Sequence, residues 1–164
     1  MTTTDHPTEP TTHLARMLSP GAVVVDVDAP SRKRVFEDAA ALFENQHGAA
    51  ARDVLRQLFE REKLGSTALG CGVAIPHARV AGLESPLAAV LRLRQPIPFD
   101  APDDEPVWLL IFMLVPQVAT QAHLEALAEI AQALSDRPLR EQLRSATESE
   151  ELYRALVGWQ PAAR

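Results

Sequence analysis

The sequence predicts a single α/β domain in which helices flank a central mixed β-sheet. Short apolar runs alternate along the chain with longer segments whose apolar residues recur at helical spacing, an order typical of layered α/β domains. The chain has 164 residues and is 46% hydrophobic, which is enough for one domain with a substantial core. Two domains in a chain of this length would each be small for stability.

Three segments have the composition of strands. AVVVDVDA (22–29) is rich in valine and is followed by Pro30. LAAVLRLR (87–94) alternates like a half-buried strand, and VWLLIFMLV (107–115) is continuously apolar, as expected for a strand buried on both faces. The proline-rich segment 95–106 between the last two is predicted to be a loop.

Helices are predicted between these strands and after them. Ser31 is a suitable N-cap for a helix that Gly48 ends, and a second helix ends at Gly65. Thr120 is expected to cap a third helix, and two more helical segments follow Pro138. The third helix has an apolar stripe that we expect to be buried, formed by Leu124, Leu127, Ile130, Ala131 and Leu134.

The folded domain is predicted to span residues 13–158. Residues 1–12 are rich in threonine and proline without periodicity, and are predicted to be a flexible N-terminal tail. Residues 159–164 are predicted to be a C-terminal tail.

Composition restricts the cellular setting and the partners. No apolar run is long enough to cross a membrane, and the N-terminus lacks the features of a secretion signal. The single cysteine excludes an internal disulfide, so we expect a cytoplasmic protein that does not insert into membranes. The net charge of −6, without a run of Lys or Arg, argues against nucleic acid as a partner.

Two of the five histidines stand in contexts that suit chemistry. In GCGVAIPHARV (70–80), His77 follows a proline at the end of a short apolar run. His123 lies in the first turn of the helix capped by Thr120, where free N–H groups favour an anion. A neutral imidazole can carry a phosphoryl group, and an arginine such as Arg61 or Arg79 can bind its oxygens. From the residues alone, the more usual interpretation of His77 is an ordinary strand-end residue.

Several motifs in order resemble a known family. The segments are REKLGSTALGCGVAIPHARV, IPFDAPDDEPVWLLIFMLVP and TQAHLEALAEIAQAL. Together they resemble the enzyme IIA domain of the bacterial phosphoenolpyruvate-dependent sugar phosphotransferase system, of the fructose/mannitol class. They are most similar to its nitrogen-regulatory branch. The resemblance covers almost the whole chain and implies the fructose/mannitol-type IIA fold, an α/β fold with a central mixed sheet.

The resemblance also implies roles for individual residues. The histidine of AIPH, His77, would be the phosphorylated nucleophile. His123 would be the second active-site histidine, which stabilises the phosphoryl group or orients the ring, and Arg61 of REK would be an oxyanion partner. Three further residues are candidates for substrate binding: Ser66, Thr67 and Arg79. No cofactor and no metal is implied.

The resemblance further implies a phosphotransferase that exchanges phosphoryl groups with other proteins. Family members accept phosphate from a histidine phosphocarrier protein. Sugar-specific members pass it to an enzyme IIB domain, whereas nitrogen-regulatory members mainly regulate target proteins according to their phosphorylation state. The regulatory interpretation is preferred here because the chain carries no IIB-like cysteine motif and no attached carrier domain.

Three alternatives stay open at this point. The protein could be a sugar-specific IIA component for fructose or mannitol uptake, or a binding-only regulator without phosphoryl transfer. A metal site built from His77, His123 and Cys71 is the third, although the spacing of known metal motifs is missing. Cys71 stands where relatives often have asparagine and is expected to be a small buried residue.

Overall fold

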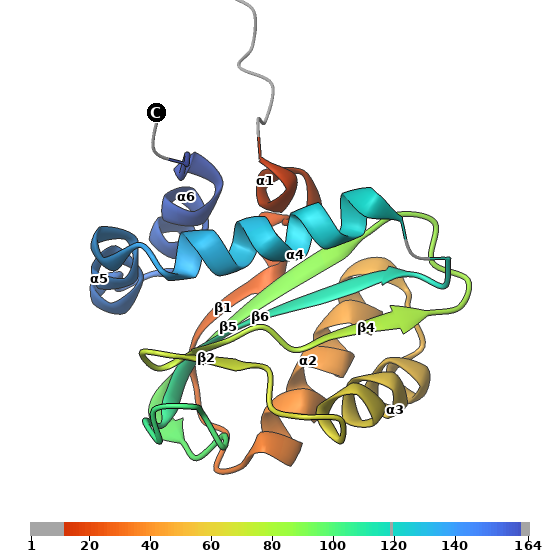
Figure 1. Cartoon of the computed structure of the whole chain (residues 1–164), viewed down its shortest axis with the longest axis horizontal. Helices are drawn as coiled ribbons and strands as arrows, with labels where there is room; N and C mark the ends of the chain where they lie inside the picture. Colours follow the sequence, from red (N-terminus) through yellow and green to blue (C-terminus); the bar gives the residue numbers. More distant parts are fainter. Residues whose placement is uncertain (1–11, 119, 162–164) are drawn as a thin grey trace, which may run out of the picture.

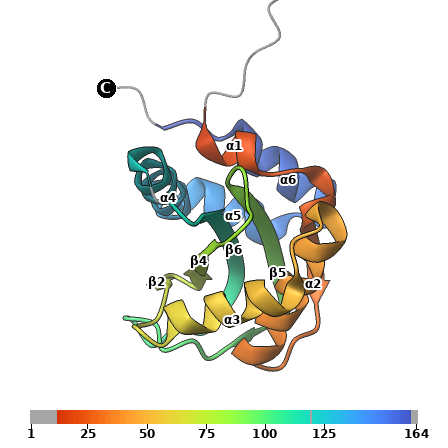
Figure 2. The same ribbon diagram turned by 90° about the vertical axis from the view of Figure 1, so that its right-hand side faces the viewer.

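The structure, a computed structural model, has three layers, with the β-sheet between two layers of helices (Figures 1 and 2). It describes residues 12–118 and 120–161, so most of the predicted N-terminal tail (1–11) and the end of the predicted C-terminal tail (162–164) lie outside the described residues. Helices α2 and α3 cover one face of the sheet, and α1, α4 and α6 cover the other. The predicted α/β fold with a central mixed sheet is confirmed. The helices are α1 (His13–Met17), η1 (Pro20–Ala22), α2 (Arg32–His47), α3 (Ala51–Glu62), α4 (Gln121–Leu134), α5 (Arg137–Ser145) and α6 (Ser149–Gly158).

The sheet has the strand order β1-β5-β6-β3-β2, and β4 also pairs with β6. Pairing is parallel between β1 and β5 and between β6 and each of β3 and β4, whereas β5 with β6 and β2 with β3 are antiparallel. The strands are β1 (Val23–Val27), β2 (Ala68–Gly70), β3 (Val73–Ala74), β4 (His77–Val80), β5 (Leu87–Ile97) and β6 (Val107–Pro116).

Strands β3 and β4 lie end to end along the same side of β6. Val73 pairs with Leu109, and His77 pairs with Met113 further along. Between them Pro76 has no N–H to donate, but its carbonyl accepts a hydrogen bond from the Met113 amide at 3.0 Å. His77 is therefore the first residue of a strand within the sheet, which corrects the interpretation that a strand ends at this histidine.

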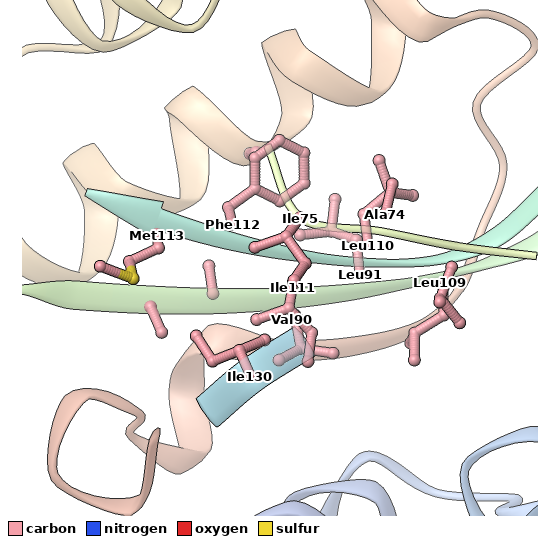
Figure 3. Packing of buried hydrophobic residues seen from close by; sticks show 14 of the residues in the cluster. Ala74, Ile75, Val90, Leu91, Leu109, Leu110, Ile111, Phe112, Met113 and Ile130 are labelled. Atoms are coloured by element: carbon pink, nitrogen blue, oxygen red, sulfur yellow. The ribbon is translucent and has the colours of Figure 1, made fainter. Parts of the chain in front are cut away.

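The core forms on both faces of β6, which is buried from Val107 to Val115. Figure 3 shows the side chains of Ile111 and Phe112 pointing to opposite faces, with Ile111 near Ile130 of α4. On the other face the rings of Phe112 and Phe36 of α2 meet edge to face, with centroids 5.6 Å apart. The expectation that this strand is buried on both faces is confirmed.

Local sequence signals account for both ends of α2 and for an irregularity in β5. The Ser31 side chain accepts a hydrogen bond from the Arg34 amide, and Gly48 has the left-handed φ of 74° that ends α2. Strand β5 continues to Ile97, three residues beyond the prediction, and its register against β6 shifts between Arg92 and Ile97. Such an irregularity accommodates Pro96, which cannot donate to a regular ladder.

Both ends of the described chain are fixed to the layer that contains α4. Thr12 is buried and accepts a hydrogen bond from the Ala15 amide, while Glu129 of α4 accepts bonds from the first two amides of α1. Trp159 donates from Nε1 to Asp136 at 2.9 Å. Thr12 and Trp159 thus contact the folded core, although the predicted boundaries assign them to tails. Within the described residues no helix is long and apolar enough to span a bilayer.

Candidate functional site

Three elements bring the predicted site residues together. Helix α3 ends just after Arg61, strand β4 begins at His77, and His123 is the third residue of α4. All three side chains line a cavity of about 570 Å³, together with Arg79. A smaller adjoining cavity of about 380 Å³ is lined by Arg61 and His77, and also by Ser66 and Thr67. All six residues predicted for the phosphoryl site therefore line at least one of these two cavities.

The ring of His77 is held in one orientation by a backbone carbonyl. Its Nδ1 lies 2.8 Å from the carbonyl oxygen of Ile75. A carbonyl oxygen only accepts hydrogen bonds, so Nδ1 carries the proton and Nε2 carries the free lone pair of the neutral ring. The side chain is half-buried at the start of β4.

Electrostatics favour the neutral form of His77. Burial lowers the pKa of this histidine below its ordinary value, and the charge of Arg61 lowers it further. The hydrogen bond to Ile75 and the charge of Glu62 act in the opposite direction, but the pKa remains lowered overall. The ring is consequently a neutral nucleophile near pH 7.

His123 is oriented by its own helix. Its Nδ1 accepts a hydrogen bond from the Thr120 amide at 3.2 Å, and its own amide donates to the Thr120 carbonyl at 3.1 Å. Because an amide only donates, Nδ1 holds a lone pair and Nε2–H is the donor of the neutral ring. The half-buried ring thus supplies a hydrogen-bond donor to the larger cavity.

Arg61 is held at the end of α3. Its Nη1 donates to the carbonyl of Gly65 at 3.0 Å, which leaves the other N–H groups of the guanidinium for a ligand. Arg79 is exposed two residues after His77, so both project from the same face of β4.

The hydroxyl groups of Ser66 and Thr67 are bonded within the protein. Ser66 Oγ donates to the Phe99 carbonyl at 2.6 Å, and Thr67 Oγ1 donates to the Glu62 carboxylate at 2.8 Å. In this structure their hydroxyls hold the loop between α3 and β2. Their predicted part in substrate binding stays a prediction.

Exposed leucines surround the two cavities. Leu64, Leu69 and Leu124 are 83%, 44% and 62% exposed, and each lines one or both cavities. Val118, in the loop before α4, is 76% exposed. The expectation that Leu124 belongs to a buried stripe is wrong, because the first turn of α4 borders the cavities instead of the core. Helical periodicity alone does not show whether an apolar residue of α4 faces the core or the cavities.

Cys71 lies away from the histidines in a tight turn. It is exposed and has a φ of 58°, and Gly72, which follows it, has a φ of 80°. These two residues join β2 to β3, so the expectation of a small buried residue is wrong. Cys71 lines neither cavity, and the described part of the chain holds no group of three or more His, Cys, Asp or Glu residues that could bind a metal ion.

Comparison with protein families agrees with this geometry. Residues 16–158 match the family model described as phosphoenolpyruvate-dependent sugar phosphotransferase system, EIIA 2. The chain therefore belongs to this family, and the resemblance stated from the motifs is confirmed.

Its relatives include members of the nitrogen-regulatory branch. A nitrogen regulatory protein from Pseudomonas aeruginosa is 46% identical over 145 residues, which cover 88% of this chain and 94% of the relative. The crystal structure of nitrogen regulatory protein IIA-Ntr from Neisseria meningitidis has a TM-score of 0.82 and 44% identity, covering 87% of this chain and 97% of that one. The IIA mannitol structure from Escherichia coli, at 19% identity, has a TM-score of 0.70 over 84% of this chain and 97% of that one, and shares the fold.

Proposed function

We propose that the protein is a phosphohistidine carrier that works in the bacterial cytoplasm and regulates target proteins. It accepts a phosphoryl group on Nε2 of His77 from a histidine phosphocarrier protein. The observation that carries this proposal is the hydrogen bond from His77 Nδ1 to the Ile75 carbonyl. This bond leaves the Nε2 lone pair as the nucleophile in a ring that lines both cavities.

The transfer step needs no proton acceptor on this chain. The Nε2 lone pair of His77 attacks the phosphorus of the carrier's phosphohistidine in line. As the new N–P bond forms, the N–P bond of the carrier breaks and its electron pair stays on the carrier's ring nitrogen. The proton on Nδ1 remains, so the phosphorylated ring gains positive charge and donates more strongly to Ile75.

Two side chains would stabilise the phosphoryl group. Arg61 has N–H donors beyond the one bound to Gly65, and the neutral ring of His123 has its donor on Nε2. Both would donate to phosphoryl oxygens, where charge-assisted hydrogen bonds are strong. Arg79, Ser66 and Thr67 line the same cavities and would have a lesser part in binding.

The exposed leucines support a protein as the phosphoryl donor. Apolar side chains at the border of a charged site are a usual core for protein association, and a small donor molecule would leave Leu64 and Leu124 in water. The similarity to nitrogen regulatory proteins supports regulation of target proteins by the phosphorylation state, as distinct from supply of phosphate to a sugar permease.

Intact mass spectrometry tests the proposal. The protein is mixed with enzyme I, a histidine phosphocarrier and phosphoenolpyruvate, and the wild type is compared with His77→Ala and His123→Ala. We expect one acid-labile phosphate on the wild type, none on His77→Ala, and a poorly retained or poorly transferred phosphate on His123→Ala. His47→Ala, an exposed histidine at the end of α2, is the matched control and should behave as wild type.

The possible results separate the alternatives. Phosphate on folded His77→Ala at the wild-type rate would identify another nucleophile. No phosphate on folded wild type, with a carrier that phosphorylates a known acceptor, would favour a binding-only regulator. Onward transfer from the wild type to a fructose or mannitol IIB domain would favour the sugar-specific alternative.

A further inference from the structure

Glu62 is a buried carboxylate beside the site for which the local structure gives no reason. Only 5% of its side chain is exposed, and burial of a carboxylate is costly unless donors surround it. It is also the last residue of α3, where the helix dipole disfavours negative charge. Its position therefore depends on contacts outside its own helix.

Those contacts come from the loop that carries the site. Glu62 accepts hydrogen bonds from the Thr67 amide at 3.0 Å and from the Thr67 hydroxyl at 2.8 Å. Arg32 of α2 approaches the same carboxylate at 3.5 Å. The loop between Glu62 and Thr67 contains Gly65, whose carbonyl holds Arg61. The bonds of Glu62 thus close the loop on which the position of Arg61 depends.

The same bonds lead to the ring of His77. The Thr67 carbonyl accepts a hydrogen bond from the Ile75 amide at 3.0 Å, and the Ile75 carbonyl is the group bonded to His77 Nδ1. A continuous chain of hydrogen bonds therefore connects Glu62, Thr67, Ile75 and His77. Each of its three links is made within the protein and involves a residue that is buried or half-buried.

We propose that Glu62 is a positioning residue for phosphoryl transfer, which orients the ring of His77 through Thr67 and Ile75 and holds Arg61 beside it. This inference rests on the proposed function of His77. Glu62 does not touch the phosphoryl group, and it acts by fixing the residues that do. Its negative charge also opposes that of Arg61 at the imidazole, since the two charges change the pKa of His77 in opposite directions.

Three variants separate the geometry from the charge. Glu62→Gln keeps the length of the side chain but removes the charge, whereas Glu62→Asp keeps the charge but is too short to maintain both bonds to Thr67. Thr67→Val removes one of these bonds from the other side and is the mildest change. Glu37→Gln, at an exposed position of α2, is the matched control.

Two measurements are made on each folded variant. The first is the rate of phosphate uptake from the phosphocarrier, and the second is the NMR titration and nitrogen shifts of the His77 ring. Since a misplacement of about 1 Å can cost about 100-fold in rate, we expect Glu62→Asp and Glu62→Gln to lose about tenfold or more. Glu62→Asp should lower the fraction of the ring protonated at Nδ1, and Glu62→Gln should lower the pKa of His77. Thr67→Val should lose less than either, and Glu37→Gln should match wild type.

The outcomes that overturn the inference differ from those that overturn the function. Wild-type uptake together with an unchanged His77 ring in folded Glu62→Asp and Glu62→Gln would show that Glu62 positions nothing. A loss of rate that only follows the loss of folded protein would assign Glu62 to stability. Absence of phosphate on the wild type itself would remove the proposed function, and this result is read from a different sample.

Discussion

Replacement of Leu124 by alanine separates docking from folding more sharply than any change at the histidines. Leu124 lies in the first turn of α4, is 62% exposed, and lines both cavities at His77. Leu134 lies at the other end of the same helix and is 1% exposed. The same substitution at these two positions should therefore have opposite consequences.

The structure sets the expected magnitudes. Full burial of a leucine is worth about 1.5–3 kcal/mol, so Leu124→Ala, which removes a mostly exposed side chain, should cost less than about 1 kcal/mol of folding free energy. Leu134→Ala should cost about 2–5 kcal/mol because it leaves a cavity. If a docked carrier covers Leu124, its loss should weaken association by about 1–2 kcal/mol, which corresponds to a factor of about 5–30.

Urea unfolding and the kcat/KM for phosphate uptake at limiting phosphocarrier measure the two effects. Leu124→Ala should unfold close to wild type but take up phosphate about 5–30 times more slowly. Leu134→Ala should be less stable, yet its folded fraction should take up phosphate at the wild-type rate. Uptake by Leu124→Ala at the wild-type rate would refute the assignment of the exposed leucines to docking.

Three further predictions concern stability. Burial lowers the pKa of His77, so the unfolded chain binds this proton more readily than the folded protein. The free energy of unfolding should therefore fall as the pH decreases through 6.5, the ordinary pKa of histidine, toward the lower pKa of the folded state. Urea unfolding across this pH range should show a smaller fall in His77→Ala, and the same pH dependence in wild type and His77→Ala would contradict the reasoning. Cys71→Asn should raise the free energy of unfolding by about 0.5–1 kcal/mol because asparagine suits the left-handed turn, and no gain over Cys71→Ala would contradict this. Arg92 is buried and donates to three carbonyls at the end of α5, so Arg92→Met should cost about 2–4 kcal/mol, whereas exposed Arg94→Met should cost almost nothing by the same measurement.

Much of the fold follows from local patterns. The apolar run 107–115 predicts a central strand because every position in it is apolar, and a strand with two buried faces needs no alternation. Ser31 and Gly48 predict the ends of α2 because a hydroxyl cap and a left-handed glycine satisfy backbone groups that any helix leaves open. The family resemblance singled out His77, His123 and Arg61 from the sequence. The structure places them at the start of β4, the start of α4 and the end of α3, around one cavity.

The exposure of single side chains did not follow from the same patterns. Leu124 has the spacing of a core residue, but the start of α4 borders the cavities, and only the tertiary arrangement shows this. Cys71 is small and adjacent to an apolar run, which suggests burial, yet two positive φ angles make it the exposed corner of a hairpin. In both cases the deciding fact is where an element ends relative to its neighbours, and element ends are poorly determined by periodicity.

The orientation of His77 depends on strand register, which no local pattern records. In a strand the amide and the carbonyl of one residue point to the same side, so the amide and carbonyl of Ile75 both face the side of β2. The Thr67 carbonyl takes the Ile75 amide, and the chain then turns away toward α3, so the Ile75 carbonyl lies beyond the paired part of β2 and accepts the ring of His77 instead. In a regular antiparallel ladder the Thr67 amide would donate to this carbonyl, but that amide donates to the Glu62 carboxylate at 3.0 Å, so the carbonyl is left for the ring. If Glu62 has the positioning role proposed above, the tautomer of His77 depends on this bond between Glu62 and Thr67.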